Sequence, residues 1–277
     1  EGKLPVSCLV TVGLGNRMLS LGIDSGSTMT KGVLFDGSSV IAQRMLPTSM
    51  RPGEVLREIC TGLKSSETEM VISTGYGREL LKDADAKITE ITCHGAGAAW
   101  LCPGCDAVID VGGQDCKAIL LDQDGQVTDF LMNDKCAAGT GRFMEMIMAR
   151  VGSDISCLDS FVEGCSPIPI NSMCAVFAES EIVGLLAKEA NPGDIVLGCV
   201  HSICRRTAVF AEKITPARPK VFFSGGLAQS EVMRRVLGEY MKDAEIVTHP
   251  LAQYTGAVGA AVLGYRKLMR RKRNHGA

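Results

Sequence analysis

The chain has 277 residues, of which 22% are charged, and its formal net charge is −2 at pH 7. This length is sufficient for two lobes that each bury a core, and the charge balance argues against nucleic acid or a membrane as a partner. The 12 cysteines, without a recognisable secretory signal, indicate a reducing, cytoplasmic compartment where thiols are metal ligands, catalytic groups or core residues.

Residues 1–18 contain apolar stretches that Gly13 and Arg17 interrupt, so we interpret them as an N-terminal extension and not as a signal peptide or membrane span. The following segment GIDSGSTMTKGVLFDG, residues 22–37, predicts a strand ending in Asp24, a glycine turn and a second strand. Rossmann and P-loop phosphate loops both open a helix, so this hairpin is neither. Ser27 and Thr28 still offer backbone and hydroxyl donors to phosphate oxygens, and Asp24 is placed to hold a hydrated Mg²⁺.

A second copy of this hairpin appears in VIDVGGQDCKAILLDQDG, residues 108–125. Identical residues recur at one constant offset, and the pairs are Ile23/Ile109, Asp24/Asp110, Gly26/Gly112, Lys31/Lys117, Leu34/Leu120 and Asp36/Asp122. The repeat predicts two similar half-structures, in which Asp110 matches the metal-binding position of Asp24. CPGC at 102–105 has no partner CxxC, so we interpret it as a turn between the lobes.

Two further cysteines precede predicted helices. In NDKCAAGTGRF, residues 133–143, Cys136 stands before a helix whose apolar face begins at Phe143, and in residues 170–189 Cys174 stands before a second amphipathic stretch that includes Val176 and Phe177. A helix N-terminus lowers the pKa of a thiol, so both sulfurs are plausible metal ligands. An iron–sulfur or zinc site normally requires four, and a two-fold dimer supplies them.

The last third of the chain predicts core and closing elements. Cys199 and Cys204 would diverge on a helix, which favours core packing. KVFFSGGLAQS, residues 220–230, predicts a strand that runs into Gly225 and Gly226, a turn open to a planar base or ribose. A closing helix is expected over residues 255–272, with a solvated basic end.

Two hairpin phosphate loops and a late glycine turn resemble the actin, hexokinase and Hsp70 superfamily. The resemblance implies an α/β fold of two lobes with duplicated mixed sheets and a nucleotide cleft between them. We expect the first lobe over 19–103, completed by the closing helix over 255–272, and the second lobe over 104–254.

A closer resemblance rests on GIDSGST, TGYGR, EITCHGAGA, VIDVGGQD, FLMNDKCAAGTGRF, NSMCAVFAESE and PLAQYTGAVGAAVLG. These motifs, spread over about residues 20–265, are similar to the activators of 2-hydroxyacyl-CoA dehydratases within the BadF/BadG/BcrA/BcrD ATPase family. The resemblance implies that Cys136 and Cys174 hold one [4Fe–4S] cluster between two subunits. It also implies that ATP or ADP with Mg²⁺ is bound by Ser27, Thr28, Met29, Thr30, Lys31, Gln114, Gly226, Ala228 and Gln253. From the glycine turns themselves we expect Gly112, Gly113 and Gly225 to contribute to the same site.

The function expected from these residues is an ATPase coupled to low-potential, one-electron transfer. Asp110 and Gln114 are expected near the attacking water and the metal, with Asp24 on the metal side. The implied partners are a second copy of the chain, a dehydratase or reductase iron–sulfur protein, and ferredoxin or flavodoxin as electron source. Glu179 and Glu181, two apart on a helix, face different ways, so solvent exposure is expected for at least one.

Other functions remain open at this stage. A component of a benzoyl-CoA-type reductase, or of an orphan double-cubane-cluster protein, would share every motif. A small-molecule kinase would share the phosphate loops without needing Cys136 and Cys174, whereas a structural zinc dimer would need the cysteines and not the duplicated hairpin.

Overall fold

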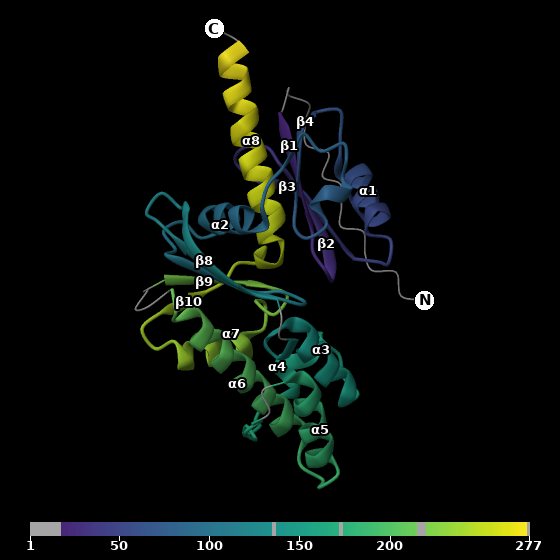
Figure 1. Ribbon diagram of the computed structural model, residues 1–277, viewed down its shortest axis with the longest axis vertical. Helices are drawn as coiled ribbons and strands as arrows, with labels where there is room; N and C mark the ends of the chain where they lie inside the picture. Colours follow the sequence, from purple (N-terminus) through teal and green to yellow (C-terminus); the bar gives the residue numbers. More distant parts are fainter. Residues whose placement is uncertain (1–17, 135–136, 172–173, 215–219, 276–277) are drawn as a thin grey trace.

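The computed structural model describes residues 18–134, 137–171, 174–214 and 220–275, and it contains two five-stranded sheets (Figure 1). The strands of the first sheet are β1 (Leu19–Ser25), β2 (Met29–Phe35), β3 (Val40–Pro47), β4 (Thr68–Thr74) and β5 (Ala86–Lys87). Those of the second are β6 (Ala107–Val111), β7 (Cys116–Leu121), β8 (Val127–Asn133), β9 (Lys220–Gly225) and β10 (Glu245–Val247).

The helices surround these sheets. They are α1 (Pro52–Leu63), α2 (Glu90–Leu101), α3 (Gly141–Arg150), α4 (Leu158–Phe161), α5 (Ala175–Leu186), α6 (Pro192–Ala211), α7 (Glu231–Tyr240) and α8 (Thr255–His275). Short 3-10 turns are η1 (Arg78–Leu80), η2 (Ala137–Gly139), η3 (Ile155–Cys157) and η4 (Ala252–Tyr254). Capping side chains set where three of these helices begin. The side chains of Thr89, Asn191 and Ser230 accept hydrogen bonds from backbone amides in the first turns of α2, α6 and α7.

Both sheets have the same topology, which confirms the predicted duplication. Their strand orders are β3-β2-β1-β4-β5 and β8-β7-β6-β9-β10. In each, the first strand pairs antiparallel with the second strand of its hairpin and parallel with a later strand. All residues of β1 and β6 are buried, as expected for central strands covered on both faces.

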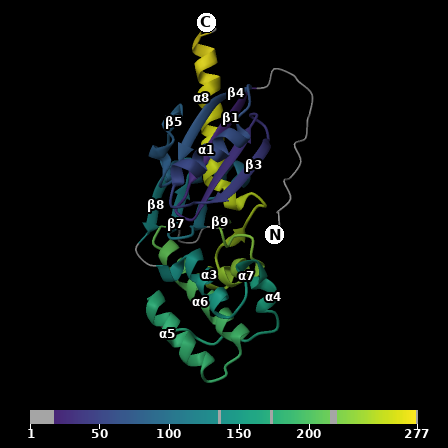
Figure 2. The same ribbon diagram turned by 90° about the vertical axis from the view of Figure 1, so that its right-hand side faces the viewer.

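The sheets and helices form alternating layers (Figures 1 and 2). Helix α1 covers one face of the first sheet and α8 packs against β1, β2 and β4, while α2 packs against both α8 and strands β6, β7 and β8. Helices α6 and α7 pack against the second sheet and against each other. The pair α2 and α8 therefore lies between the two sheets and connects them.

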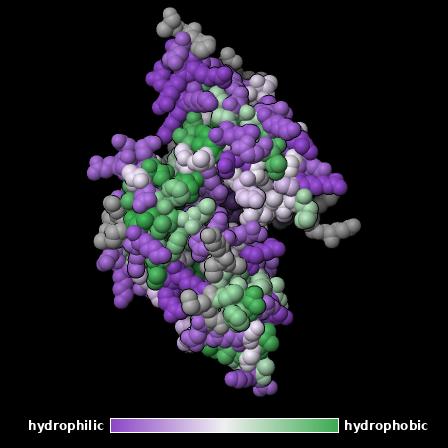
Figure 3. Space-filling model, in the orientation of Figure 1, coloured by the Kyte–Doolittle hydropathy of each residue, from purple (hydrophilic) through white to green (hydrophobic). Residues whose placement is uncertain are grey.

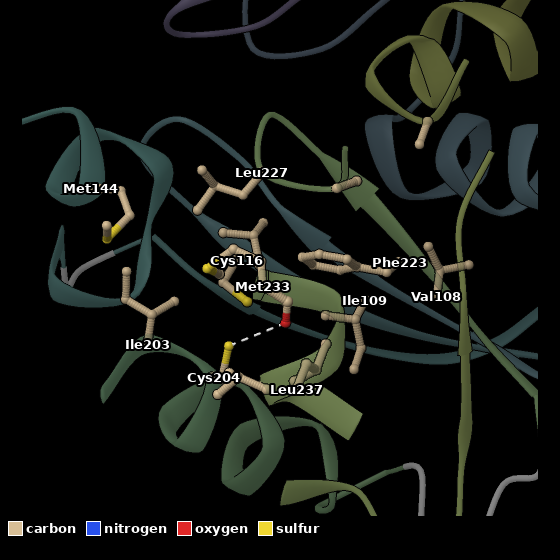
Figure 4. Packing of buried hydrophobic residues seen from close by; sticks show 14 of the residues in the cluster. Val108, Ile109, Cys116, Met144, Ile203, Cys204, Phe223, Leu227, Met233 and Leu237 are labelled. Atoms are coloured by element: carbon tan, nitrogen blue, oxygen red, sulfur yellow. Dashed lines mark hydrogen bonds between the residues drawn. The ribbon is translucent and has the colours of Figure 1, made fainter. Parts of the chain in front are cut away.

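Several cysteines belong to the core, as the sequence predicted. Cys199 and Cys204 are buried on α6, and the Cys204 thiol donates to the Met233 carbonyl at 3.5 Å (Figure 4). Burial raises the pKa of Cys199 to about 12. The Cys102–Cys105 pair forms the predicted turn, in which the Cys105 amide donates to the Cys102 carbonyl at 3.1 Å.

The basic end of α8 extends beyond the first sheet (Figure 1). Among the described residues, no helix combines the length and the apolar character that a membrane span needs.

Candidate functional site

A cavity of about 820 Å³ lies where the ends of β1, β6 and β9 meet, and it is lined from both sheets. The space-filling view shows the molecule hollowed between its upper and lower parts (Figure 3). The predicted residues that line this cavity are Asp24, Ser27, Thr28, Met29, Lys31, Asp110, Gly112, Gly113, Gln114, Gly225, Gly226 and Gln253. The fold thus brings most of the predicted nucleotide site into one place.

Two residues of the predicted nucleotide site, Thr30 and Ala228, are not among those that line the cavity. Thr30 is buried and its hydroxyl contacts the Thr48 hydroxyl at 2.9 Å. Ala228 is 1% exposed and packs in the core behind the late glycine turn. Both side chains support the loops from behind, so any contact with a ligand in the cavity would come from their backbone.

The two phosphate loops approach each other directly. A Cβ at Gly113, in the turn between β6 and β7, would overlap the Thr28 hydroxyl of the turn between β1 and β2. The backbone amides of Gly141 and Arg142 donate to the carbonyls of Gly112 and Gly113 at 2.8 and 3.0 Å. The start of α3 is therefore tied to the second phosphate loop.

Asp110, at the end of β6, sits in a network of donors. The Ser224 hydroxyl donates to Oδ1 at 2.7 Å, and His94 Nε2 lies 3.6 Å from the same oxygen. Burial would raise the pKa of Asp110, but His94, Lys117 and Ser224 outweigh it and hold the pKa below its usual range. Asp110 is therefore an ionised carboxylate at neutral pH.

Lys117, which faces Asp110 across the hairpin, is surrounded by acidic groups. Its Nζ lies 2.8 Å from Asp115, 2.9 Å from Glu90 and 3.3 Å from Asp110. Burial would lower the pKa of Lys117, but these three carboxylates raise it above its ordinary value. This ammonium group is committed to the protein, and it holds α2 and the second phosphate loop together.

Asp24, at the end of β1, can accept a further hydrogen bond or bind a cation. Its Oδ1 is buried and, within the described part of the chain, has no hydrogen-bond partner, while Oδ2 lies 4.0 Å from Lys31 Nζ. A buried carboxylate oxygen without a donor is costly unless a cation or donor reaches it. The donor set of Asp24 and Asp110, two hard oxygen ligands facing one cavity, fits Mg²⁺.

The late turn follows β9. Gly225 adopts a φ of 96°, which favours glycine, and a Cβ there would overlap the Val111 carbonyl. Gly226 faces open space, and Nε2 of the Gln253 side chain donates to its carbonyl at 3.2 Å. Because glycine has no side chain, a ring or ribose in the cavity could approach the backbone at this turn closely.

Helices α3 and α5, which follow the two cysteines in the chain, both pack against α6. Cys136 lies outside the described residues, and α3 begins shortly after it, as predicted. Cys174 is exposed and is the N-cap residue of α5, and its own side chain makes no capping hydrogen bond there. An exposed thiol at the start of a helix suits a metal-bound thiolate, because the helix N-terminus favours the charged form of the sulfur.

One prediction about α5 is wrong. Val176 and Phe177 do not join the core, since they are 69% and 68% exposed. Ala178 and Ile182 form the buried face instead, and Val176 and Phe177 lie off that face. Exposed apolar atoms accordingly interrupt the polar surface at the lower end of the molecule, where α5 lies (Figure 3).

The sequence did not indicate Glu90, His94 and Asp115 as site residues. All three line the cavity, and they contact Asp110 or Lys117. Glu90 and His94 are four residues apart on α2, so they share a face, and this spacing within EITCHGAGA is the signal that was available. Tyr76 of TGYGR also lines the cavity and is 86% exposed.

Fold and site together define a two-lobed α/β protein of the actin and hexokinase type, with a phosphate-loop cavity between duplicated sheets. Within that class, the chain belongs to the BadF/BadG/BcrA/BcrD ATPase family, which it matches over residues 21–264. The fold class and the family are those that the sequence predicted.

Individual relatives agree with this assignment. The chain is 44% identical to the uncharacterized protein YjiL of Escherichia coli over 254 residues, covering 91% of this chain and 99% of the relative. It is 36% identical to the 2-hydroxyisocaproyl-CoA dehydratase activator of Clostridioides difficile over 255 residues, covering 90% and 95% of the two chains.

Solved structures show the same relationship. The activator of the 2-hydroxyisocaproyl-CoA dehydratase from Clostridium difficile with bound ADPNP superposes with a TM-score of 0.86 at 35% identity, covering 93% of this chain and 98% of the other. The ROK hexokinase from Thermus thermophilus, at 13% identity and a TM-score of 0.52, covers 91% of this chain and 100% of its own and shares the fold alone.

Proposed function

We propose that the chain is an ATP-dependent one-electron donor that activates a 2-hydroxyacyl-CoA dehydratase-type partner. The observation that carries the proposal is the exposed thiol of Cys174 at the N-terminus of α5, in a chain whose cavity is lined by two hairpin turns suited to phosphate. The 36% identity to a dehydratase activator over 90% of the chain supports the same function.

We assign three roles to the residues that line the cavity. Lys31, Ser27 and Thr28, together with the second loop and the late turn, would bind ATP or ADP, and Asp24 and Asp110 would hold Mg²⁺. Asp110 and Gln114 would orient the attacking water. Each of these residues lines the cavity.

Cys136 and Cys174 would hold a [4Fe–4S] cluster, which supplies one-electron transfer when bound. Because such a cluster normally takes four thiolates, a homodimer would contribute two from each copy. Ferredoxin or flavodoxin would supply the electron. The exposed Val176 and Phe177 beside Cys174 are apolar surface that the second copy would cover.

Nucleotide and thiol sites would be coupled through α3. The backbone amides of Gly141 and Arg142, at the start of α3, donate to the second phosphate loop. Closure of the loops on a nucleotide would therefore move α3, the helix that follows Cys136.

Anaerobic purification tests this function. We expect a brown homodimer with about four irons per dimer, and loss of iron with retention of ATP binding in Cys174→Ser and Cys136→Ser. A colourless, iron-free protein after anaerobic reconstitution would contradict the proposal and favour a small-molecule kinase. Capture of the partner from anaerobic extract would separate a dehydratase activator from a component of a benzoyl-CoA-type reductase or a double-cubane-cluster protein.

A further inference from the structure

The backbone that leads to Cys174 is fastened to α6. This strap, residues 166–171, is held by Asp194, whose Oδ1 accepts from the Ser166 amide at 2.8 Å and whose carbonyl accepts from the Ile168 amide at 3.1 Å. Ile170 is 3% exposed, and a Cβ at Gly198 would overlap the Ile168 carbonyl. The strap therefore lies directly on the α6 backbone.

The last residue of the strap is fastened to α5 itself. Glu181 Oε1 accepts a hydrogen bond from the Asn171 amide at 3.1 Å, three positions before Cys174 in the chain. After burial, the Glu181 charge is the next cause that raises the pKa of Cys199, so the carboxylate is near α6 as well as the strap. Glu179 differs, because its carboxylate pairs with Arg150 of α3.

We propose that Glu181 is a positioning residue for Cys174, an inference that rests on the proposed cluster-binding function. A helix is usually joined to the preceding chain by a capping side chain, and in a capping box a glutamate inside the helix bonds back to the incoming backbone. Cys174 provides no cap, since its sulfur is free and exposed. Glu181 lies farther along α5 than the glutamate of a capping box, but it accepts the equivalent hydrogen bond from the incoming backbone, at Asn171. Cys174 lies between Asn171 and Glu181 in the chain, and its thiol stays free to bind a metal.

Matched alanine variants on the same helix test this role. In anaerobically purified Glu181→Ala, we expect iron release to a chelator to be about tenfold faster than in wild type, because a charge-assisted hydrogen bond is lost, with a changed line shape of the reduced cluster in electron paramagnetic resonance. Glu181→Gln keeps an acceptor oxygen, so its rate of iron release should lie between those of wild type and Glu181→Ala. Glu179→Ala should release iron at the wild-type rate within about twofold, since its partly exposed ion pair contributes little.

A second measurement does not depend on iron. Hydrogen exchange at the Asn171 amide should be about tenfold faster in Glu181→Ala and unchanged in Glu179→Ala, with ATP binding confirming that both variants fold. Equal iron release and equal exchange in the two alanine variants would overturn the role of Glu181. If wild-type protein holds no iron while Asn171 exchange responds only to Glu181→Ala, the cluster function fails and the placement of Cys174 by Glu181 stands.

Discussion

Lys31 and Lys117 occupy matching positions in the two hairpins, and their surroundings differ sharply. Each lies opposite the aspartate that ends the preceding strand. Among the described residues, the Lys117 ammonium group has three carboxylates within 3.3 Å, whereas Lys31 lies 4.0 Å from the Asp24 carboxylate and lines the cavity. The duplicated position has therefore diverged into a structural lysine and a lysine that faces the cavity.

This divergence predicts opposite effects for the same substitution. Lys31→Met should weaken ATP binding about 10- to 100-fold, the value of a charge-assisted hydrogen bond, with little change in stability. Lys117→Met should lower the free energy of unfolding by about 3 to 5 kcal/mol, because three carboxylates lose their cation. Calorimetric titration with ATP and urea unfolding of both variants would check this; weaker binding alone from Lys117→Met would contradict it.

Asp110 predicts a particular dependence of stability on pH. Its pKa is lower in the folded protein than in the unfolded chain, since His94, Lys117 and Ser224 together outweigh burial. Its stabilising contribution is therefore complete above the unfolded pKa of about 3.9 and is lost as pH falls through the folded value. The difference in unfolding free energy between wild type and Asp110→Asn should shrink below about pH 4. Urea unfolding between pH 3 and 7 measures it, and a constant difference would count against this account.

The late turn offers a pair of adjacent glycines with different requirements. Gly225→Ala should cost about 1 to 3 kcal/mol of stability, because the residue has a φ of 96° and a methyl group would meet the Val111 carbonyl. Gly226→Ala meets open space and should fold normally. Thermal unfolding of the two variants gives the comparison, and equal losses would show that the turn conformation does not require glycine at 225.

Cysteine reactivity should separate surface from core. Cys174 and Cys157 are exposed, so iodoacetamide should label them within minutes in cluster-free protein. Cys116 and Cys199 are buried with pKa values of about 12, which leaves roughly 1000-fold fewer thiolates than an ordinary cysteine at neutral pH. Peptide mapping after a short pulse would show this order, and early labelling of Cys116 would contradict the packing of β7.

Much of the fold follows from local pattern. The offset between Asp24 and Asp110 predicted both hairpins, because a strand, turn and strand are encoded within sixteen or so consecutive positions. Strand alternation also explains why Thr30 points away from the cavity while Met29 and Lys31 line it, as neighbouring side chains on β2 take opposite faces.

Contacts made by packing were not visible in the sequence. Glu90 and His94 reach Lys117 and Asp110 only because α2 lies on the second sheet. Their spacing of four residues puts them on one face of α2, but it does not encode which sheet that face meets. The orientation of α5 was likewise misjudged at Val176, since a short helix rich in apolar residues has more than one candidate core face. The roles of Glu179 and Glu181 could not be separated until their partners on α3 and the strap were placed.

The position of α8 has a consequence for the order of folding during synthesis. Strand β1 is made first among the described elements, yet its covering helix begins at Thr255, more than two hundred positions later. Domains usually fold in the order in which they emerge from the ribosome. Here the second sheet, whose strands and helices are complete by Tyr254, can close first, and β1 must wait with one apolar face open until α8 is synthesised.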